Sequence, residues 1–290
     1  MELEINRLTK SYGHKTAVDS FSAAFTDGIY ALLGANGSGK TTLMRMVCGL
    51  LKPTAGEVLL DGTPISEAGE SYRELLGYLP QNFGYYPNFT GWDFMMYLAA
   101  LKGLPKFSAE ERCAELLDLV GLHGERQRKL KTYSGGMLQR IGVAQSLINN
   151  PKILILDEPT AGLDPKERAK FRNIISGLSS GRIVILSTHI VSDVEYIADT
   201  VMIMKNGQLA LQNSSAHICD AIDGCVWRCA VPDERVAEVS TRYVVSNLRH
   251  TESEVEMRII SAAKPFGNAV AVTPNLEDLY LYFFREAQAK

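Results

Sequence analysis

Long hydrophobic runs are missing from this chain of 290 residues. The longest, residues 94–101, spans about eight positions, whereas a helix that crosses a bilayer needs ~20. We therefore expect the chain not to cross a membrane. The first residues also lack a cationic stretch followed by an apolar one, so no secretory signal is expected.

An excess of either charge is missing as well. Lys and Arg number 30 and Asp and Glu number 33, which gives a net charge of −3. This balance disfavours extensive binding to a nucleic-acid backbone. Hydrophobic residues make up 46% and charged residues 22%, which excludes a largely disordered or collagen-like chain. At ~150 residues per domain, the length suggests about two domains or one large α/β domain.

Paired cysteines are absent too. The five cysteines are Cys48, Cys113, Cys219, Cys225 and Cys229. An odd number at uneven spacing indicates reduced thiols in a cytosolic compartment. The last three form His-x-Cys-x5-Cys-x3-Cys together with His217, so a zinc site is one interpretation. The pattern lacks a Cys-x2-Cys pair, and this favours the other interpretation, buried or idle thiols.

The first ~210 residues alternate short apolar runs with amphipathic helical patterns, which is typical of an α/β domain. Residues 29–33, 153–156 and 183–186 are continuously apolar, as strands covered on both faces tend to be. Residues 2–8 and 16–25 predict antiparallel strands on one edge. Asn206-Gly207 between residues 201–204 and 208–211 predicts a hairpin.

Three helices can be placed from local signals. Leu43, Met46, Val47 and Leu50 share one helical face. Ser108-x-x-Glu111 predicts a capping box, and Gly121 the end of that helix. Asp164-Pro165 predicts the first residues of another helix.

The pattern changes after about residue 215. Residues 226–231, 244–248 and 255–260 predict strands, and residues 235–241 and 276–284 predict helices. We therefore expect two domains, residues 1–214 and residues 215–290, of which the second is a small α+β appendage.

The main chemical motif is G-x4-G-K-[ST] between an expected strand and an expected helix. Its residues are Gly34, Asn36, Gly37, Ser38, Gly39, Lys40, Thr41 and Thr42. Glycines let successive backbone N–H groups point at phosphate oxygens, and the helix N-terminus adds partial positive charge. Lys40 is expected to reach the β- and γ-phosphates, and the Thr41 hydroxyl to ligate Mg²⁺. The alternative is a merely flexible glycine loop.

Asp157 and Glu158 end the apolar run 153–156. The Asp157 carboxylate is expected beside the phosphate loop, where it can hold Mg²⁺ through water. Glu158 is a candidate base for the attacking water. Together with the phosphate loop, this pair predicts hydrolysis of a nucleoside triphosphate.

Tyr133-Ser134-Gly135-Gly136-Met137-Leu138-Gln139-Arg140 resembles the signature of ABC-transporter ATPases. Tyr12, Gln81 in Leu-Pro-Gln, Asp164 in Ala-Gly-Leu-Asp and His189 in Ser-Thr-His follow the family's other motifs in order. The resemblance covers about residues 1–215. It implies an α/β phosphate-loop NTPase core with an antiparallel β edge and a helical subdomain.

The resemblance also implies roles for single residues. Tyr12 would stack on adenine, Gln81 would sense metal and water, and His189 would contact the γ-phosphate. Ser134, Gly135 and Gly136 would bind the nucleotide held by a second subunit. Asp164 would lie at the dimer interface, although Ser134 and Asp164 also suit simple helix caps. Tyr133 and Met137 depart from the family's Leu-Ser-Gly-Gly-Gln, so a hydrogen bond from the fifth side chain is lost.

The resulting interpretation is a cytosolic ATP-binding subunit on the inner face of the membrane, with ATP and Mg²⁺ as cofactors. Two copies would pair with two-fold symmetry around two ATP molecules. A separate transmembrane subunit would dock on residues 82–104, which hold seven aromatic residues. Phe94, Tyr97, Leu98 and Leu101 fit a buried helix face, so all-core packing is the alternative there.

A single nucleotide domain with a C-terminal appendage is similar to type-2 exporter ATPases. The sequence leaves open a soluble family member in DNA repair or translation. Such proteins carry a coiled coil or tandem nucleotide domains, and the sequence shows neither. A phosphate-loop kinase is a third class, but it would not need Ser134-Gly-Gly.

Overall fold

The computed structural model describes residues 1–251 and 254–284. The chain divides into two compact units, Met1–Ala210 and Leu211–Lys290. The expected boundary after residue 214 therefore lies a few residues late, at the end of strand β10 (Gln208–Ser214).

The first unit contains a six-stranded sheet in the order β10-β9-β3-β8-β7-β6. Its other strands are β3 (Gly28–Leu33), β6 (Leu76–Leu79), β7 (Ile153–Asp157), β8 (Ile183–Thr188) and β9 (Thr200–Lys205). β3, β7 and β8 run parallel, and every residue of β7 and β8 is buried. Continuous apolar runs thus predicted these strands correctly. Since the strands are parallel, their carboxyl ends meet at one edge of the sheet.

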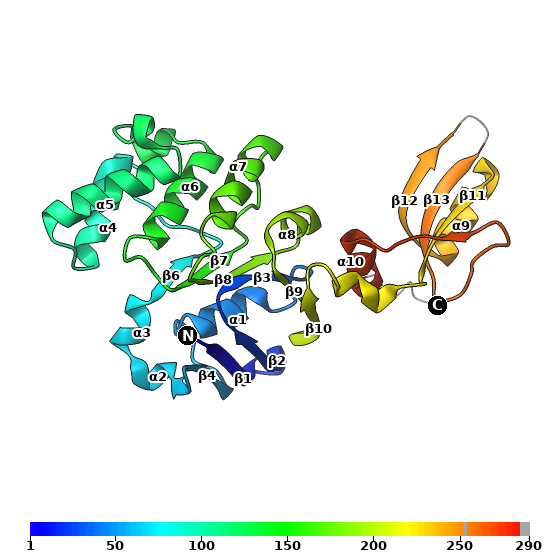
Figure 1. Cartoon of the computed structure of the whole chain (residues 1–290), viewed down its shortest axis with the longest axis horizontal. Coiled ribbons are helices and arrows are strands. Elements are labelled where there is room, and N and C mark those ends of the chain that lie inside the picture. The colour runs from blue at the N-terminus through cyan, green and yellow to red at the C-terminus, as the bar shows by residue number, and fades with distance from the viewer. Residues whose placement is uncertain (252–253, 285–290) are drawn as a thin grey trace. The chain divides into compact units, whose positions relative to one another are not determined.

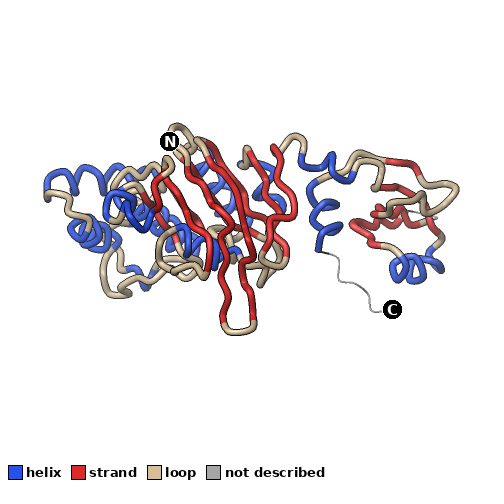
Figure 2. The backbone as a smooth tube through the Cα atoms, turned by 90° about the horizontal axis from the view of Figure 1, so that it is seen from below, coloured by secondary structure: helices blue, strands red, loops and turns tan. Residues whose placement is uncertain are grey.

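A second, antiparallel sheet of the first unit has the order β2-β1-β4-β5. Its strands are β1 (Leu3–Tyr12), β2 (Lys15–Phe25), β4 (Ala55–Leu60) and β5 (Thr63–Pro64). The expected antiparallel strands are therefore confirmed, but they form a sheet of their own rather than the edge of the parallel one. Figure 2 shows the strands of both sheets in red. Phe21, Met44, Ile155 and Ile185 belong to one buried cluster between them.

Eight α-helices of the first unit are described. They are α1 (Lys40–Val47), α2 (Ile65–Ala68), α3 (Glu70–Glu74), α4 (Gly91–Leu101), α5 (Lys106–Leu119), α6 (Gly135–Ser146), α7 (Pro165–Ser176) and α8 (Val191–Ile197). Short 3-10 turns lie at His123–Glu125 and Leu130–Thr132. Helices α4, α5 and α6 pack against one another and form the expected helical part of the fold (Figure 1).

Two local helix predictions are wrong. Leu50 is 60% exposed, because α1 ends at Val47 and Gly49 turns the chain away with φ +69°. Ser108 lies inside α5 and caps nothing, because Pro105 precedes the first helical residue and its carbonyl accepts from Ala109 N at 2.9 Å. The predicted end of this helix is confirmed, with Gly121 at φ +66°.

In the second unit, the described residues form a four-stranded antiparallel sheet in the order β12-β13-β11-β14 and two α-helices. Its elements are a 3-10 turn at Ile218–Ile222, β11 (Val226–Val231), a 3-10 turn at Asp233–Arg235, α9 (Val236–Arg242), β12 (Val244–His250), β13 (Val255–Ile260), β14 (Val270–Ala271) and α10 (Leu276–Phe284). Cys229, Val239 and Met257 lie in its core. The predicted α+β composition of this part is confirmed.

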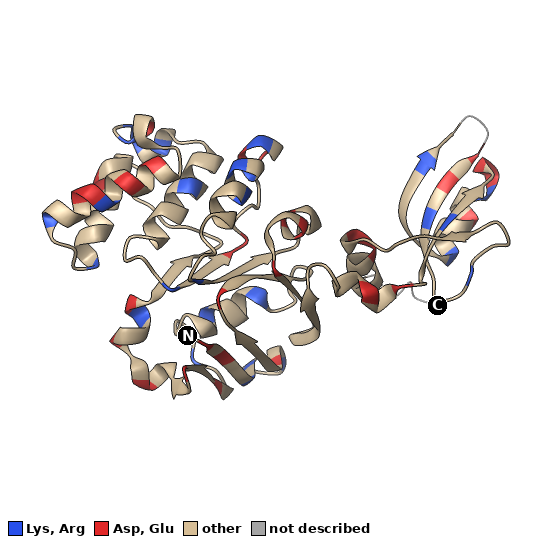
Figure 3. Cartoon of the chain, in the orientation of Figure 1, with Lys and Arg blue, Asp and Glu red and all other residues tan. Residues whose placement is uncertain are grey.

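Within the described ranges, no helix combines the length and the apolar character that a membrane span requires. Along the backbone, Lys and Arg positions are interspersed with Asp and Glu positions over the elements of both units (Figure 3).

Candidate active site

The predicted phosphate loop connects β3 to α1. Gly39 precedes the helix with φ +107°, and a Cβ there would lie 2.3 Å from the Ala17 carbonyl oxygen. A Cβ on Gly34 would lie 2.6 Å from the Met204 carbonyl oxygen. Both positions therefore require glycine, and the loop folds tightly against neighbouring backbone.

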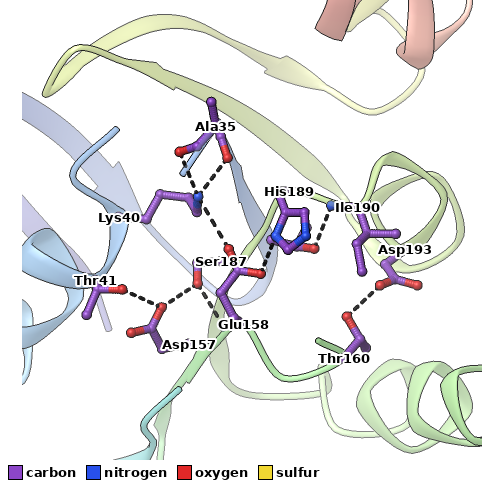
Figure 4. A network of polar contacts seen from close by, with 12 residues as sticks. Ala35, Lys40, Thr41, Asp157, Glu158, Thr160, Ser187, His189, Ile190 and Asp193 are labelled. Atoms are coloured by element: carbon purple, nitrogen blue, oxygen red, sulfur yellow. Dashed lines mark hydrogen bonds and ion pairs between the residues drawn. The ribbon is translucent and has the colours of Figure 1, made fainter. Parts of the chain in front are cut away.

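Lys40 points back into this loop. Its Nζ donates to the carbonyl oxygens of Gly34 at 2.6 Å and Ala35 at 3.2 Å. The same Nζ lies 3.3 Å from Glu158 Oε1, and both side chains are about 5% exposed. The predicted phosphate-binding lysine and the predicted base are thus an ion pair at the sheet edge (Figure 4).

Asp157 ends β7 and is fully buried. Its Oδ1 accepts from Ser187 Oγ at 2.6 Å and Thr41 Oγ1 at 3.2 Å. Its Oδ2 makes no hydrogen bond within the described chain. Burial raises the pKa of this carboxyl, and the hydrogen bonds from Ser187 and Thr41 oppose the rise.

Glu158 has φ +51°, which is rare for a residue with a side chain. Its backbone N–H donates to Ser187 Oγ at 2.9 Å, and its Oε2 lies 2.7 Å from His189 Nδ1. β7 pairs in parallel with β8 so that Asp157 lies opposite Ser187. This register brings His189, just beyond the end of β8, to Glu158.

A pocket of about 420 Å³ opens beside these groups. Its lining includes Tyr12, Lys15, Ala17, Asn36, Gly37, Ser38, Gly39, Lys40, Thr41, Thr42, Gln81 and Glu158. Ser38 Oγ is buried and makes no hydrogen bond to a described residue. The structure therefore brings Tyr12 and Gln81 to the phosphate loop, as the resemblance implies, and 50% of Tyr12 is exposed.

The predicted signature residues lie elsewhere on the chain. Ser134 caps α6, where its Oγ accepts from Met137 N at 3.2 Å. Asp164 caps α7 by accepting from Glu167 N at 2.9 Å. Ser134, Gly135 and Asp164 are exposed, and neither they nor Gly136 line the pocket of the same described chain.

Tyr133, the departure at the first signature position, has a packing role. It is 7% exposed, and its hydroxyl donates to the Glu125 carbonyl oxygen at 2.9 Å. A Cβ on Gly91 would lie 2.3 Å from that hydroxyl, so the start of α4 accommodates the ring only because residue 91 is glycine. Tyr133, two residues before the start of α6, therefore packs against the start of α4.

Ser187, Lys15 and Ala17 were not predicted as site residues. Ser187 bridges Asp157 and Glu158, and its signal was its place in Ser187-Thr188-His189 at the end of a buried strand. Lys15 and Ala17 line the pocket from β2, which no motif indicated.

An aromatic groove of about 520 Å³ lies between β6, the chain after it and α4. Its lining includes Phe83, Tyr85, Tyr86, Phe94, Tyr97 and Leu101. The expectation that four α4 residues form one buried face is wrong in part. Phe94 is buried, but Tyr97 is 38% and Leu101 66% exposed, because α4 packs with its other side on α5 and α6.

The candidate zinc pattern of the second unit does not assemble. Cys229 is buried in the core of the sheet, and His217 contacts Asp220 at 3.1 Å. Among the residues with described positions, no group of three or more His, Cys, Asp or Glu side chains is arranged to hold a metal ion.

A phosphate loop, an Asp-Glu pair at the end of one strand and a histidine just beyond the end of the adjacent strand define a phosphate-loop ATPase. Comparison with known proteins shows to which family of phosphate-loop ATPases the chain belongs. The model of the ABC transporter family matches residues 22–161. The uncharacterized ABC transporter ATP-binding protein YxlF of Bacillus subtilis (strain 168) is 42% identical over 209 residues, which are 72% of this chain and 69% of that protein.

Two further similarities agree. The bacitracin transport ATP-binding protein BcrA of Enterococcus faecalis is 40% identical over 210 residues, covering 71% of this chain and 67% of that protein. A solved ATP-binding subunit of an ABC transporter superposes with a TM-score of 0.65 at 27% identity, covering 74% of this chain and 90% of that one. The chain belongs to the family of ABC transporter ATP-binding proteins, whose activity is ATP hydrolysis.

Proposed function

We propose that this chain is the ATP-hydrolysing subunit of an exporter, and that it drives a separate transmembrane subunit from the cytoplasmic face of the membrane. One observation carries the proposal: the ATP pocket and an exposed aromatic groove lie in the same unit and share one segment, because Gln81 lines the pocket whereas Pro80 and Phe83 line the groove. The similarity to a protein of bacitracin transport favours export of an antibiotic or peptide.

In the proposed reaction, the phosphate-loop N–H groups and Lys40 bind the triphosphate. Without nucleotide, Lys40 holds Glu158 in an ion pair. A triphosphate competes for the Lys40 ammonium, and the Glu158 carboxylate is then available to a water molecule. His189 keeps its contact with Glu158, and together they orient the attacking water toward the γ-phosphate. Tyr12 stacks on the adenine.

The residues present fit a magnesium ion. Asp157 Oδ2 is buried without a hydrogen bond to any described residue, its Oδ1 accepts from Thr41 Oγ1, and Thr41 and Gln81 line the ATP pocket. Thr41, Asp157 and Gln81 are therefore the groups that would hold Mg²⁺, with Asp157 acting through water. When bound, the ion supplies positive charge that neutralises the β- and γ-phosphate oxygens.

We further propose that two copies pair around ATP. Ser134, Gly135, Gly136 and Asp164 are displayed at the starts of α6 and α7, outside the pocket of their own described chain. A helix N-terminus with a serine hydroxyl binds anions well. These residues would therefore complete the ATP site of the second copy, and loss of the γ-phosphate would weaken the pair.

The aromatic groove is the proposed docking site for a short helix of the transmembrane subunit. Tyr86 is 49% exposed, and its ring packs on Phe89 and Tyr97 with centroid distances of 5.0 and 5.5 Å. The three rings form an exposed aromatic cluster, and exposed clusters of this kind mark interfaces.

The test is membrane fractionation of Tyr86→Asp in the native host, together with ATPase assays on the purified chain. A charge in the groove should lower the membrane-bound fraction about tenfold, whereas the turnover of the purified chain stays within about twofold. Phe107→Asp is the matched control, because Phe107 is 71% exposed on α5 but does not line the groove. Unchanged membrane association of Tyr86→Asp would refute docking at this groove.

A further inference from the structure

Asp193 is a buried carboxylate that the proposed reaction does not use. It lies in the first turn of α8, 1% exposed, and it does not line the ATP pocket of the described chain. Burying a carboxylate is costly unless cations and hydrogen-bond donors compensate it. The contacts of Asp193 therefore show which segments of the chain this carboxylate connects.

The first contact reaches the segment that follows the predicted base. Thr160 Oγ1 donates to Asp193 Oδ2 at 2.6 Å, and Thr160 is 2% exposed (Figure 4). Thr160 stands two positions after Glu158 and four before Asp164. The bond thus fixes the short loop that connects the predicted base to the α7 cap.

The remaining contacts reach α7. Asp193 Oδ1 makes no hydrogen bond to a described residue, but it lies 3.5 Å from Arg172 Nη1 and 3.9 Å from Arg168 Nε. Arg168 Nη2 also donates to the Leu163 carbonyl oxygen at 3.3 Å, next to Asp164. One carboxylate therefore joins α8, α7 and the Glu158–Asp164 loop.

The segment between His189 and Asp193 is itself closed by hydrogen bonds. Ile190 N donates to Thr188 Oγ1 at 2.9 Å, and Asp193 N donates to the Ile190 carbonyl oxygen at 3.2 Å. A shift of Asp193 would therefore move the chain that carries His189. The same shift would move the loop behind Glu158.

We propose that Asp193, through its bond to Thr160, is a positioning residue that keeps Glu158, His189 and the Asp164 cap in one hydrolysis-competent arrangement. It touches none of the phosphate-loop residues. Loss of the bond should consequently slow hydrolysis and leave ATP binding intact. The inference rests on the proposed roles of Glu158 and His189.

The experiment measures kcat, KM and ATP affinity of the full chain in Thr160→Val, Thr160→Ser and Asp193→Asn. Valine has almost the shape of threonine but cannot donate, so kcat should fall about tenfold while KM and ATP affinity change less than about twofold. Serine restores the donor and should restore kcat. Asp193→Asn keeps an acceptor for Thr160 but loses the charge facing the two arginines, and it should show an intermediate loss.

Two controls distinguish a positioning role from a purely structural one. Glu195→Gln, on the exposed side of α8, should change neither kcat nor ATP affinity. Thermal unfolding of Thr160→Val shows whether stability alone has changed, and a purely structural role predicts no rescue of kcat by serine. Wild-type kcat in Thr160→Val overturns the proposal. Wild-type turnover in Glu158→Gln, measured in parallel, would instead refute the proposed role of the base.

Discussion

The carboxyl of Asp157 in the ATP site is only partly compensated by hydrogen bonds. It is fully buried, and of its two oxygens only Oδ1 accepts hydrogen bonds from described residues. Burial raises its pKa above the unfolded value, so this carboxyl favours folding at low pH, and its contribution declines as pH rises through the folded-state pKa. At neutral pH the buried Asp157 carboxylate therefore lowers the stability of the fold, and a bound cation would offset this cost.

Asp157→Asn should therefore stabilise the protein without nucleotide or magnesium while it abolishes hydrolysis. An amide of the same shape keeps the acceptor for Ser187 and removes the buried charge. We therefore expect the free energy of unfolding to rise by about 1 kcal/mol and the Tm to rise by about 2–4 °C. Thermal unfolding in chelator at neutral pH measures this, with ATPase activity read on the same sample. A lower Tm for the variant would contradict the account of this carboxyl.

Site residues that form one contiguous motif could be predicted from the sequence. Residues 34–42 could be predicted because one contiguous motif dictates loop, helix start and chemistry. The Lys40–Glu158 ion pair and the Ser187 bridge could not, because they depend on the lateral order of β3, β8 and β7. Strand order is set by packing of the whole sheet, and no local pattern encodes it.

At the level of elements, strands were easier to predict than helix ends. Parallel strands buried on both faces leave continuous apolar runs, and β7 and β8 gave that signal. Ser108 was misread because its capping pattern also fits the first turn of a helix begun by Pro105. Tyr97 and Leu101 were misread because periodicity shows that a face is apolar but not whether a neighbouring helix covers it.

Helix α10 depends on an ion pair with β13. Asp278 is fully buried and accepts from Arg258 Nη2 at 2.6 Å, Ser246 Oγ at 2.6 Å and Asn275 N at 2.9 Å. Burial alone would raise the pKa of Asp278, but these donors, Arg258 foremost, hold it below its ordinary value. The stabilisation is therefore present above the unfolded pKa and is lost as pH falls through the folded-state value.

Asp278→Asn should destabilise the second unit by about 2–4 kcal/mol, because it leaves the Arg258 guanidinium without its anion. Urea unfolding at neutral pH, followed by the fluorescence of Trp227 in β11, measures the loss. The difference in stability between the variant and wild type should shrink in acid, because the protonated Asp278 carboxyl is then neutral, as the asparagine amide is. Glu277→Gln, one residue away and exposed, is the control and should cost less than about 0.5 kcal/mol. Equal stability of Asp278→Asn and wild type would show that the pair contributes nothing.

In the whole molecule, the two sets of residues proposed to contact ATP, the pocket residues and the signature residues, lie apart on one chain. The pocket holds Lys40 and Glu158, whereas Ser134 and Asp164 are displayed outside it in the described structure. A single copy therefore presents one incomplete ATP site and one signature surface. A second copy related by two-fold symmetry would complete both sites at once.

In the proposed cycle, ATP closes two copies of the chain, and hydrolysis through Glu158 reopens them. Its most direct test is size-exclusion chromatography with light scattering of Glu158→Gln at saturating ATP and magnesium, with turnover measured on the same preparation. The account predicts a stable ATP-bound dimer and turnover at least about 100-fold below wild type, because the water has lost its base. Wild-type protein and the exposed control Glu195→Gln should return to monomer as ATP is consumed. A Glu158→Gln variant that stays monomeric, or that hydrolyses ATP at nearly the normal rate, would contradict the account.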